Sequence, residues 1–146
     1  MNNLIPEEFQ KIIRSYTLFD DVYMNIFFKD EPEIIQFVLR LILDKPDLIV
    51  ESVHIQDVMT DLVAKTSRLD ILAKDKHDKQ YNIEFQVELN PNLVKRGRYY
   101  LSQLDMQCIH RGEDYDQLPD TYVIFICRGD VIKREEPIYR FTMKDQ

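Results

Sequence analysis

Apolar and polar residues alternate along much of the middle of this chain, and that pattern limits its possible folds more than any other feature. A period of two is typical of β-strands, because successive side chains of a strand point to opposite faces of a sheet. The alternation predicts strands over 49–58, 63–73 and 81–89. A short charged loop, 74–80, separates the last two, so we expect them to form a β-hairpin.

Apolar residues at helical spacing precede the strands. Residues 7–19 show this spacing, and a short stretch beginning at Asp20 shows it again. The strongest of these patterns predicts a helix over 31–43, which ends where Asp44 and Pro46 follow.

A second helical pattern follows the strands. Asn90-Pro91 can begin this helix, and we expect it to run to Gly112, a residue type that often ends helices. A buried strand is predicted over 122–127, and we expect one more strand within 136–143.

From the helix at 31–43 onward, the predicted order is α-β-β-β-α-β. Three strands joined by short loops form an antiparallel meander, and a helix after the third strand allows the fourth to join the sheet in parallel. The sequence therefore predicts an α/β fold with a mixed sheet. A length of 146 residues is typical of one domain.

The composition excludes several kinds of site. The 3 glycines all lie at or after Gly97, so no P-loop or dinucleotide-binding motif is present. The 2 cysteines and 3 histidines lack the spacing of a zinc site. A bound metal would therefore have oxygen ligands, which favours Mg²⁺ or Mn²⁺.

The net charge of −7 argues at first against a nucleic-acid partner. The charge is unevenly distributed, however, because residues 95–111 hold four basic residues and one acidic residue. No apolar run approaches the roughly 20 residues that span a bilayer, and the N-terminus lacks the pattern of a signal peptide. We expect a cytoplasmic protein with no membrane partner.

The predicted hairpin brings two carboxylates together. If it bends around His77, Asp70 lies opposite Glu84, and a shift of two residues places it opposite Gln86. Adjacent carboxylates repel each other, and a divalent cation relieves that repulsion. The alternative is an ordinary polar face of a hairpin, in which Arg68 neutralises Asp70.

At these residues the chain resembles a known family. The two strand segments are Arg68-Leu69-Asp70-Ile71-Leu72 and Tyr81-Asn82-Ile83-Glu84-Phe85-Gln86; the flanking segments are 19–27, 98–100 and 112–115. Together they resemble the PD-(D/E)XK nuclease family transposases, or recombination-promoting nucleases. Leu69 stands where the superfamily motif has proline, and Gln86 stands where it has lysine.

The resemblance implies a restriction-endonuclease-like αβββαβ core, with a mixed four-stranded sheet flanked by helices. It also implies that 1–146 forms a single nuclease-like domain, and that a C-terminal extension found in the family is missing. The function implied is Mg²⁺- or Mn²⁺-dependent DNA endonuclease activity, linked to transposition or recombination.

The family motif also implies roles for individual residues. The catalytic residues would be Asp70, Glu84 and Gln86, with Asp20 or Asp21 as an accessory acid. The metal ligands would be Asp70, Glu84 and the carbonyl of Phe85. The residues expected to contact DNA are Arg68, Lys95, Arg98 and Tyr99.

Two other functions stay open at this point. Glutamine cannot supply the charge of lysine, so Gln86 permits a catalytically inactive, nuclease-like binding or regulatory module. The third possibility is an unrelated α/β interaction domain. A homodimer would suit double-strand cutting.

Overall fold

The computed structural model describes the following parts of the chain: residues 31–55, 70–88 and 90–142, with Ser15, Phe28, 58–59 and 67–68. Apart from Ser15, the helices expected over 7–19 and after Asp20 lie outside these residues. The elements in chain order are α3 (Pro32–Leu43), β1 (Val50–Ile55), β2 (Val58–Met59), β3 (Ser67–Arg68), β4 (Ile71–Asp75), β5 (Gln80–Gln86), α4 (Leu93–Cys108), the 3₁₀ turn η1 (Tyr115–Gln117) and β6 (Thr121–Cys127).

Four of the strands form one mixed sheet in the order β1-β4-β5-β6. β1 and β5 both run antiparallel to β4, whereas β6 runs parallel to β5. The parallel pair is connected through α4, as the length of the predicted helix allowed. The predicted mixed sheet and the α-β-β-β-α-β order are confirmed, with β2 and β3 as an added two-stranded sheet.

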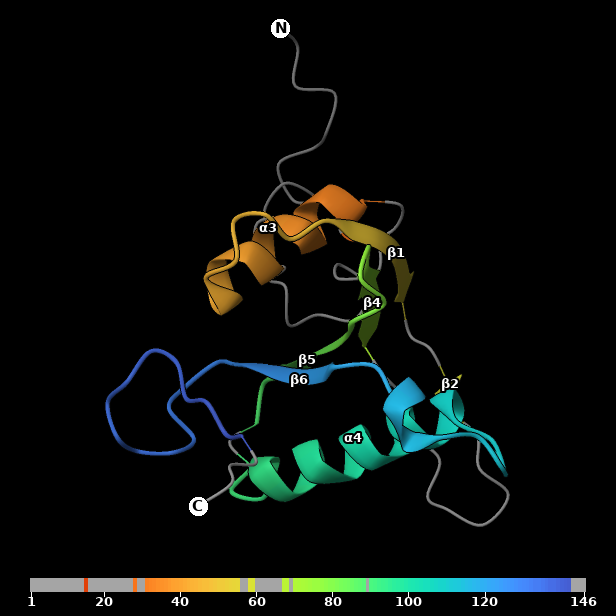
Figure 1. Cartoon of the computed structure of the whole chain (residues 1–146). Helices are drawn as coiled ribbons and strands as arrows, with labels where there is room; N and C mark the ends of the chain where they lie inside the picture. Colours follow the sequence, from red (N-terminus) through yellow and green to blue (C-terminus); the bar gives the residue numbers. More distant parts are fainter. Residues whose placement is uncertain are drawn as a thin grey trace, which may run out of the picture.

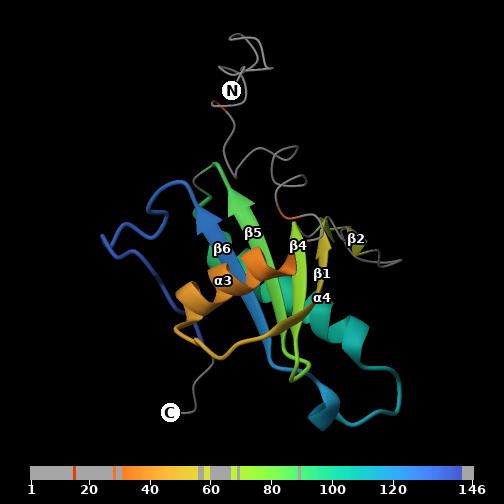
Figure 2. The same ribbon diagram turned by 90° about the horizontal axis from the view of Figure 1, so that it is seen from above.

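The sheet lies between two helices, with α3 on one face and α4 on the other (Figures 1 and 2). Buried Ile35 and Leu39 of α3 belong to one hydrophobic cluster with Ile71, Tyr81 and Ile83 of the central strands. Proline in the first turn of α3 and a left-handed Asp44 after its last turn set the ends of this helix.

The opposite face of the sheet is covered by α4. Tyr100 and Leu104 of this helix are buried against Leu72, Val123 and Phe125. Residues Asn82 and Glu84 share this face of β5, because Asn82 pairs with Leu72 and Val123 and Glu84 pairs with Phe125. The polar side of the predicted hairpin is therefore covered by a helix, with both residues buried.

The predicted strand over 63–73 is wrong as a single element, because the described part consists of β3 and β4. The two pieces keep one register, since Ile55 pairs with Ile71 and Val58 with Arg68. Asp70 lies at the break. Aspartate is disfavoured in strands, and the carboxylate of Asp70 accepts a hydrogen bond from the Phe85 N–H.

Two predictions near the C-terminus are also wrong. Helix α4 ends at Cys108, since Ile109 is already extended, and Gly112 (φ 95°) lies in the following turn. Residues 136–142 contain no strand. The carboxylate of Asp130 accepts hydrogen bonds from the N–H groups of Ile132, Lys133 and Glu135, just before this stretch, and from the Tyr139 hydroxyl within it.

The turn between β4 and β5 is built around the buried carboxylate of Asp75, at the end of the hairpin away from Asp70. The Tyr81 hydroxyl donates to it at 2.7 Å, and the N–H groups of His77 and Lys79 donate at 2.9 and 3.1 Å. Burial raises the pKa of Asp75, but these hydrogen bonds outweigh burial and hold the pKa below its ordinary value.

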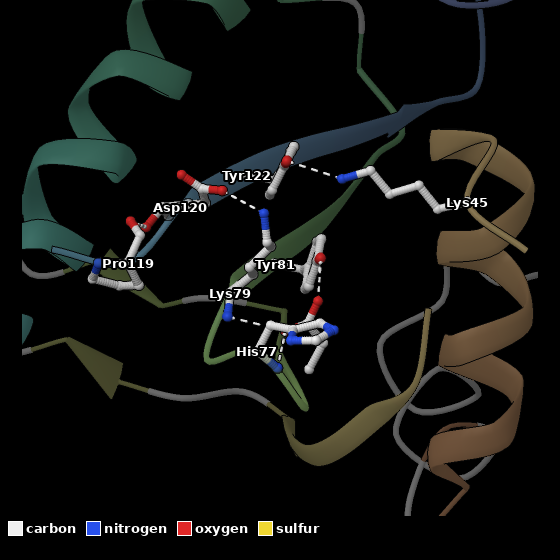
Figure 3. A network of polar contacts seen from close by, with 9 residues as sticks. Lys45, His77, Lys79, Tyr81, Pro119, Asp120 and Tyr122 are labelled. Carbon is white, nitrogen blue, oxygen red and sulfur yellow. Dashed lines mark hydrogen bonds and ion pairs between the residues drawn. The ribbon is translucent and has the colours of Figure 1, made fainter. Parts of the chain in front are cut away.

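The same end of the sheet is joined to its neighbours by aromatic and charged contacts (Figure 3). Tyr81 of β5 stacks on Tyr122 of β6, with ring centroids 5.0 Å apart. Lys45, which follows α3, donates to the Tyr122 hydroxyl at 3.1 Å, and Lys79 pairs with Asp120. These contacts fix the ends of β5 and β6 and so stabilise the hairpin.

Candidate functional site

The register of β4 and β5 places Asp70 beside Glu84, as the sequence predicted. Ile71 pairs with Ile83, so the residues just outside this pair are Asp70 and Glu84. The Asp70 N–H donates to Glu84 Oε1 at 3.4 Å, and the Phe85 N–H donates to Asp70 Oδ2 at 2.8 Å. Each carboxylate is therefore held by a backbone N–H of the neighbouring segment.

Glu84 is almost fully buried, with 2% of its surface exposed. The Asn82 side-chain amide donates to Glu84 Oε1 at 3.1 Å. Burial and then the nearby charge of Asp70 raise the pKa of Glu84 to about 7. The hydrogen bonds from Asn82 and Asp70 and the charge of Arg96 act in the opposite direction and are outweighed. The buried Glu84 carboxylate beside half-buried Asp70 therefore favours either a proton or a cation.

Phe85 and Gln86 complete the predicted catalytic segment. The Phe85 ring stacks with Phe28, with centroids 5.8 Å apart, so the side chain belongs to the core and the carbonyl is the group that a ligand could use. The Gln86 side-chain amide donates to that carbonyl at 3.2 Å. The structure thus brings Asp70, Glu84, Phe85 and Gln86 into one cluster.

Arg96 of α4 is a member of this cluster that the sequence did not identify. Its Nη1 donates to Gln86 Oε1 at 2.6 Å, and its Nη2 lies 3.8 Å from Glu84 Oε2. The guanidinium also lies over the rings of Tyr100 and Phe125, at 5.4 and 5.5 Å. The sequence signal that could have identified Arg96 is its position four residues before Tyr100, which places both side chains on the same face of the helix.

The remaining predicted residues lie elsewhere. Lys95 and Arg98 are exposed on α4, and Tyr99 is half-buried against Tyr100. Arg68 belongs to β3, but its side chain lies outside what the structure describes. The two candidate accessory acids, Asp20 and Asp21, also lie outside the described residues.

The donor groups of the cluster fit a hard divalent ion. Asp70, Glu84 and the Phe85 carbonyl offer oxygen atoms, the ligands that Mg²⁺ and Mn²⁺ prefer. The buried Asn82 Oδ1 beside them has no hydrogen-bond partner. Among the described residues, no group of three or more acidic, histidine or cysteine side chains could hold a metal. A carboxylate pair still suits Mg²⁺, which usually keeps waters and binds phosphate oxygens.

Comparison with known families shows which family this chain belongs to. The family model described as PD-(D/E)XK nuclease family transposase matches residues 19–146. The chain belongs to this family. No curated protein and no solved structure gives a significant match.

Membership of this family agrees with the observed fold and with a nuclease-type function. The mixed four-stranded sheet and its two helices form a restriction-endonuclease-like core, which confirms the predicted fold class. The family supports a nuclease-type function with DNA as the substrate, and PD-(D/E)XK nucleases generally use divalent metal ions. Within the described part of the chain, no helix is long and apolar enough to cross a membrane.

Proposed function

We propose that this chain is a Mg²⁺- or Mn²⁺-dependent DNA endonuclease that acts in transposition or recombination. The observation that carries the proposal is the pairing of Asp70 with a buried Glu84 at the end of the β4–β5 ladder. Family membership supports the reaction class, and the oxygen-only donor set supports the choice of metals.

In this mechanism Asp70 and Glu84 would hold the ion, and the Phe85 carbonyl would provide a third oxygen. When bound, the ion supplies positive charge that stabilises negative charge on the scissile phosphate. Gln86 orients the attacking water or a phosphate oxygen. The water oxygen would bond to phosphorus and lose a proton as one P–O ester bond breaks, and the departing oxygen would take up a proton. The products would be a phosphate monoester on one end and a hydroxyl on the other.

The exposed side of α4 would contact the DNA backbone. Lys95 and Arg98 are exposed there, and lysine and arginine side chains commonly bind phosphates. Half-buried Tyr99 would add a contact to sugar or base, and Arg68 would add a further phosphate contact. A local basic surface of this kind can bind DNA even though the whole chain carries a net charge of −7.

The second candidate is a nuclease-like module that binds or regulates without cutting. Gln86 supports it, because this neutral side chain occupies the lysine position of the superfamily motif and is engaged by the Phe85 carbonyl and Arg96. For either candidate we expect a cytoplasmic location, and a homodimer would suit cleavage of both strands.

Incubation of the full chain with supercoiled plasmid and Mg²⁺ or Mn²⁺ separates these two functions. The endonuclease predicts nicked or linear product that EDTA prevents. Asp70→Asn and Glu84→Gln should each slow cleavage by more than about 100-fold, since each removes charge that stabilises the reacting phosphate complex.

Glu88→Gln is the matched control, because Glu88 is an exposed glutamate just beyond β5, and it should cleave like wild type. A folded wild-type chain that leaves the plasmid intact with both metals would contradict the endonuclease and favour the binding module.

A further inference from the structure

Arg96 occupies a protected position at the centre of the cluster. Its side chain is 31% exposed, and its guanidinium lies over two aromatic rings, Tyr100 and Phe125, that belong to different elements. Nη2 also donates to the Tyr100 hydroxyl at 3.0 Å. Cation–π contacts and this hydrogen bond hold the charge in place without depending on a carboxylate.

The same guanidinium contacts both Glu84 and Gln86, the two polar motif residues of β5. The contact with Gln86 Oε1 is a short hydrogen bond of 2.6 Å, whereas the contact with Glu84 is a looser ion pair of 3.8 Å. Arginine therefore places a permanent positive charge beside the position where the superfamily motif has lysine and this chain has Gln86.

The geometry points to two roles for Arg96, both of which rest on the proposed function. Before a divalent ion binds, Arg96 neutralises Glu84. Once the ion is bound, the Arg96 guanidinium binds a non-bridging oxygen of the scissile phosphodiester. Arg96 thus supplies the catalytic cation that Gln86 cannot supply.

Electrostatics supports the exchange between these two partners. A divalent ion and a guanidinium near Glu84 neutralise the same carboxylate, so each weakens the binding of the other. A guanidinium released from Glu84 stays between its rings, with donors in a planar fork that matches phosphate oxygens. The ligand class is therefore a phosphodiester, and the competitor is a divalent cation.

Calorimetric titration of the full chain with Mn²⁺, without DNA, tests the first role. Arg96→Gln removes the competing charge, so this variant should bind Mn²⁺ about threefold more tightly or better, as expected for a partly exposed ion pair. Arg111→Gln is the control, since Arg111 is an exposed arginine after α4, and its affinity should match wild type.

Single-turnover cleavage at saturating Mn²⁺ tests the second role. Arg96→Gln should cleave about 100-fold more slowly, the usual effect of losing one donor to a transition-state oxygen. Arg96→Lys keeps the charge without the planar fork, so it should bind Mn²⁺ like wild type and recover part of the lost rate.

Tighter Mn²⁺ binding together with slower cleavage is a combination that a merely structural role would not produce. Weaker Mn²⁺ binding by Arg96→Gln would overturn the first role, and unchanged cleavage would overturn the second. If Arg96→Gln fails to fold, Arg96→Lys tests the second role. Cleavage by Arg96→Lys equal to that of wild type would contradict a role for the planar guanidinium in binding the phosphate. An inactive wild-type chain would refute the proposed function, and the Mn²⁺ affinities would still test the pairing with Glu84.

Discussion

Glu84 is a buried acid whose surroundings leave its charge incompletely balanced. Its Oε1 accepts hydrogen bonds from Asp70 and Asn82, and its Oε2 lies near Arg96. Burial beside Asp70 still raises its pKa to about 7. At neutral pH this residue is therefore poised to exchange a proton for a cation.

This pKa shift predicts how the metal-free protein responds to pH. The folded chain binds the Glu84 proton more tightly than the unfolded chain, because the pKa rises from 4.5 to about 7. Stability should fall as the pH rises from about 4.5 to about 7 and then level off. Glu84→Gln should lose this pH-dependent part of the stability, which is on the order of 3 kcal/mol.

Urea denaturation in EDTA at pH 5 and pH 8 measures the effect. Glu84→Gln should become more stable than wild type at pH 8, while Glu88→Gln should follow the wild-type pH dependence. Identical pH dependence of wild type and Glu84→Gln would contradict this prediction, because it would show that ionisation of Glu84 does not lower the stability of the folded chain.

The sequence limited the partner of Asp70 to Glu84 or Gln86, because strand alternation is a local property, and the register of the structure selects Glu84. The sequence was insufficient for Arg96. The contacts of that side chain depend on how α4 is rotated over β5 and β6, which follows from packing between distant parts of the chain. Strand alternation puts Asn82 on the same face as Glu84, but the hydrogen bond between them depends on burial under the same helix.

At the scale of elements, the distance between α4 and the sheet determines whether Arg96 can contact the site. Gly97 lies next to Arg96 and directly over Phe125 of β6. A Cβ atom added at Gly97 would lie 3.5 Å from Phe125 Cε2, an ordinary van der Waals distance. The helix is therefore close to the sheet, with room for one methyl group.

Gly97→Ala should stabilise the protein by about 0.5–1 kcal/mol, since alanine favours helix and fits this space. Gly97→Leu should destabilise it by about 1–3 kcal/mol, because the larger side chain must push α4 away from Phe125. Thermal denaturation of both variants checks these signs. Equal destabilisation by alanine and leucine would mean that the interface has no room for a methyl group.

The order and the types of α3, α4 and the four strands of the main sheet followed from hydrophobic period and turn residues alone. The errors occurred where a particular side chain replaced the expected backbone pattern. Asp70 interrupts the strand predicted over 63–73. Asp130 organises the turn that precedes 136–143, where another strand was predicted. Helix α4 ends before Gly112, so a glycine downstream of a helical pattern did not mark its end.

At the scale of the whole molecule, the two ends of the β4–β5 hairpin differ: one holds the hydrogen bonds that stabilise the turn, and the other holds the proposed cation site. Asp75 and its hydrogen bonds close one end of β4–β5, and Asp70 and Glu84 lie at the other. Helix α4 covers the second end and carries both Arg96 toward the sheet and Lys95 on its exposed side. Under the proposed function, this helix would link DNA contact to the carboxylate pair.

The central claim is that Asp70 and Glu84 act as one divalent-cation site in this nuclease-family chain. Titration of the metal-free full chain with Mn²⁺, followed by electron paramagnetic resonance of the free ion, tests it most directly. Wild type and Glu88→Gln should bind Mn²⁺, whereas Asp70→Asn and Glu84→Gln should each lose that binding. Unchanged Mn²⁺ binding in both site variants, or no binding by folded wild type, would contradict the claim.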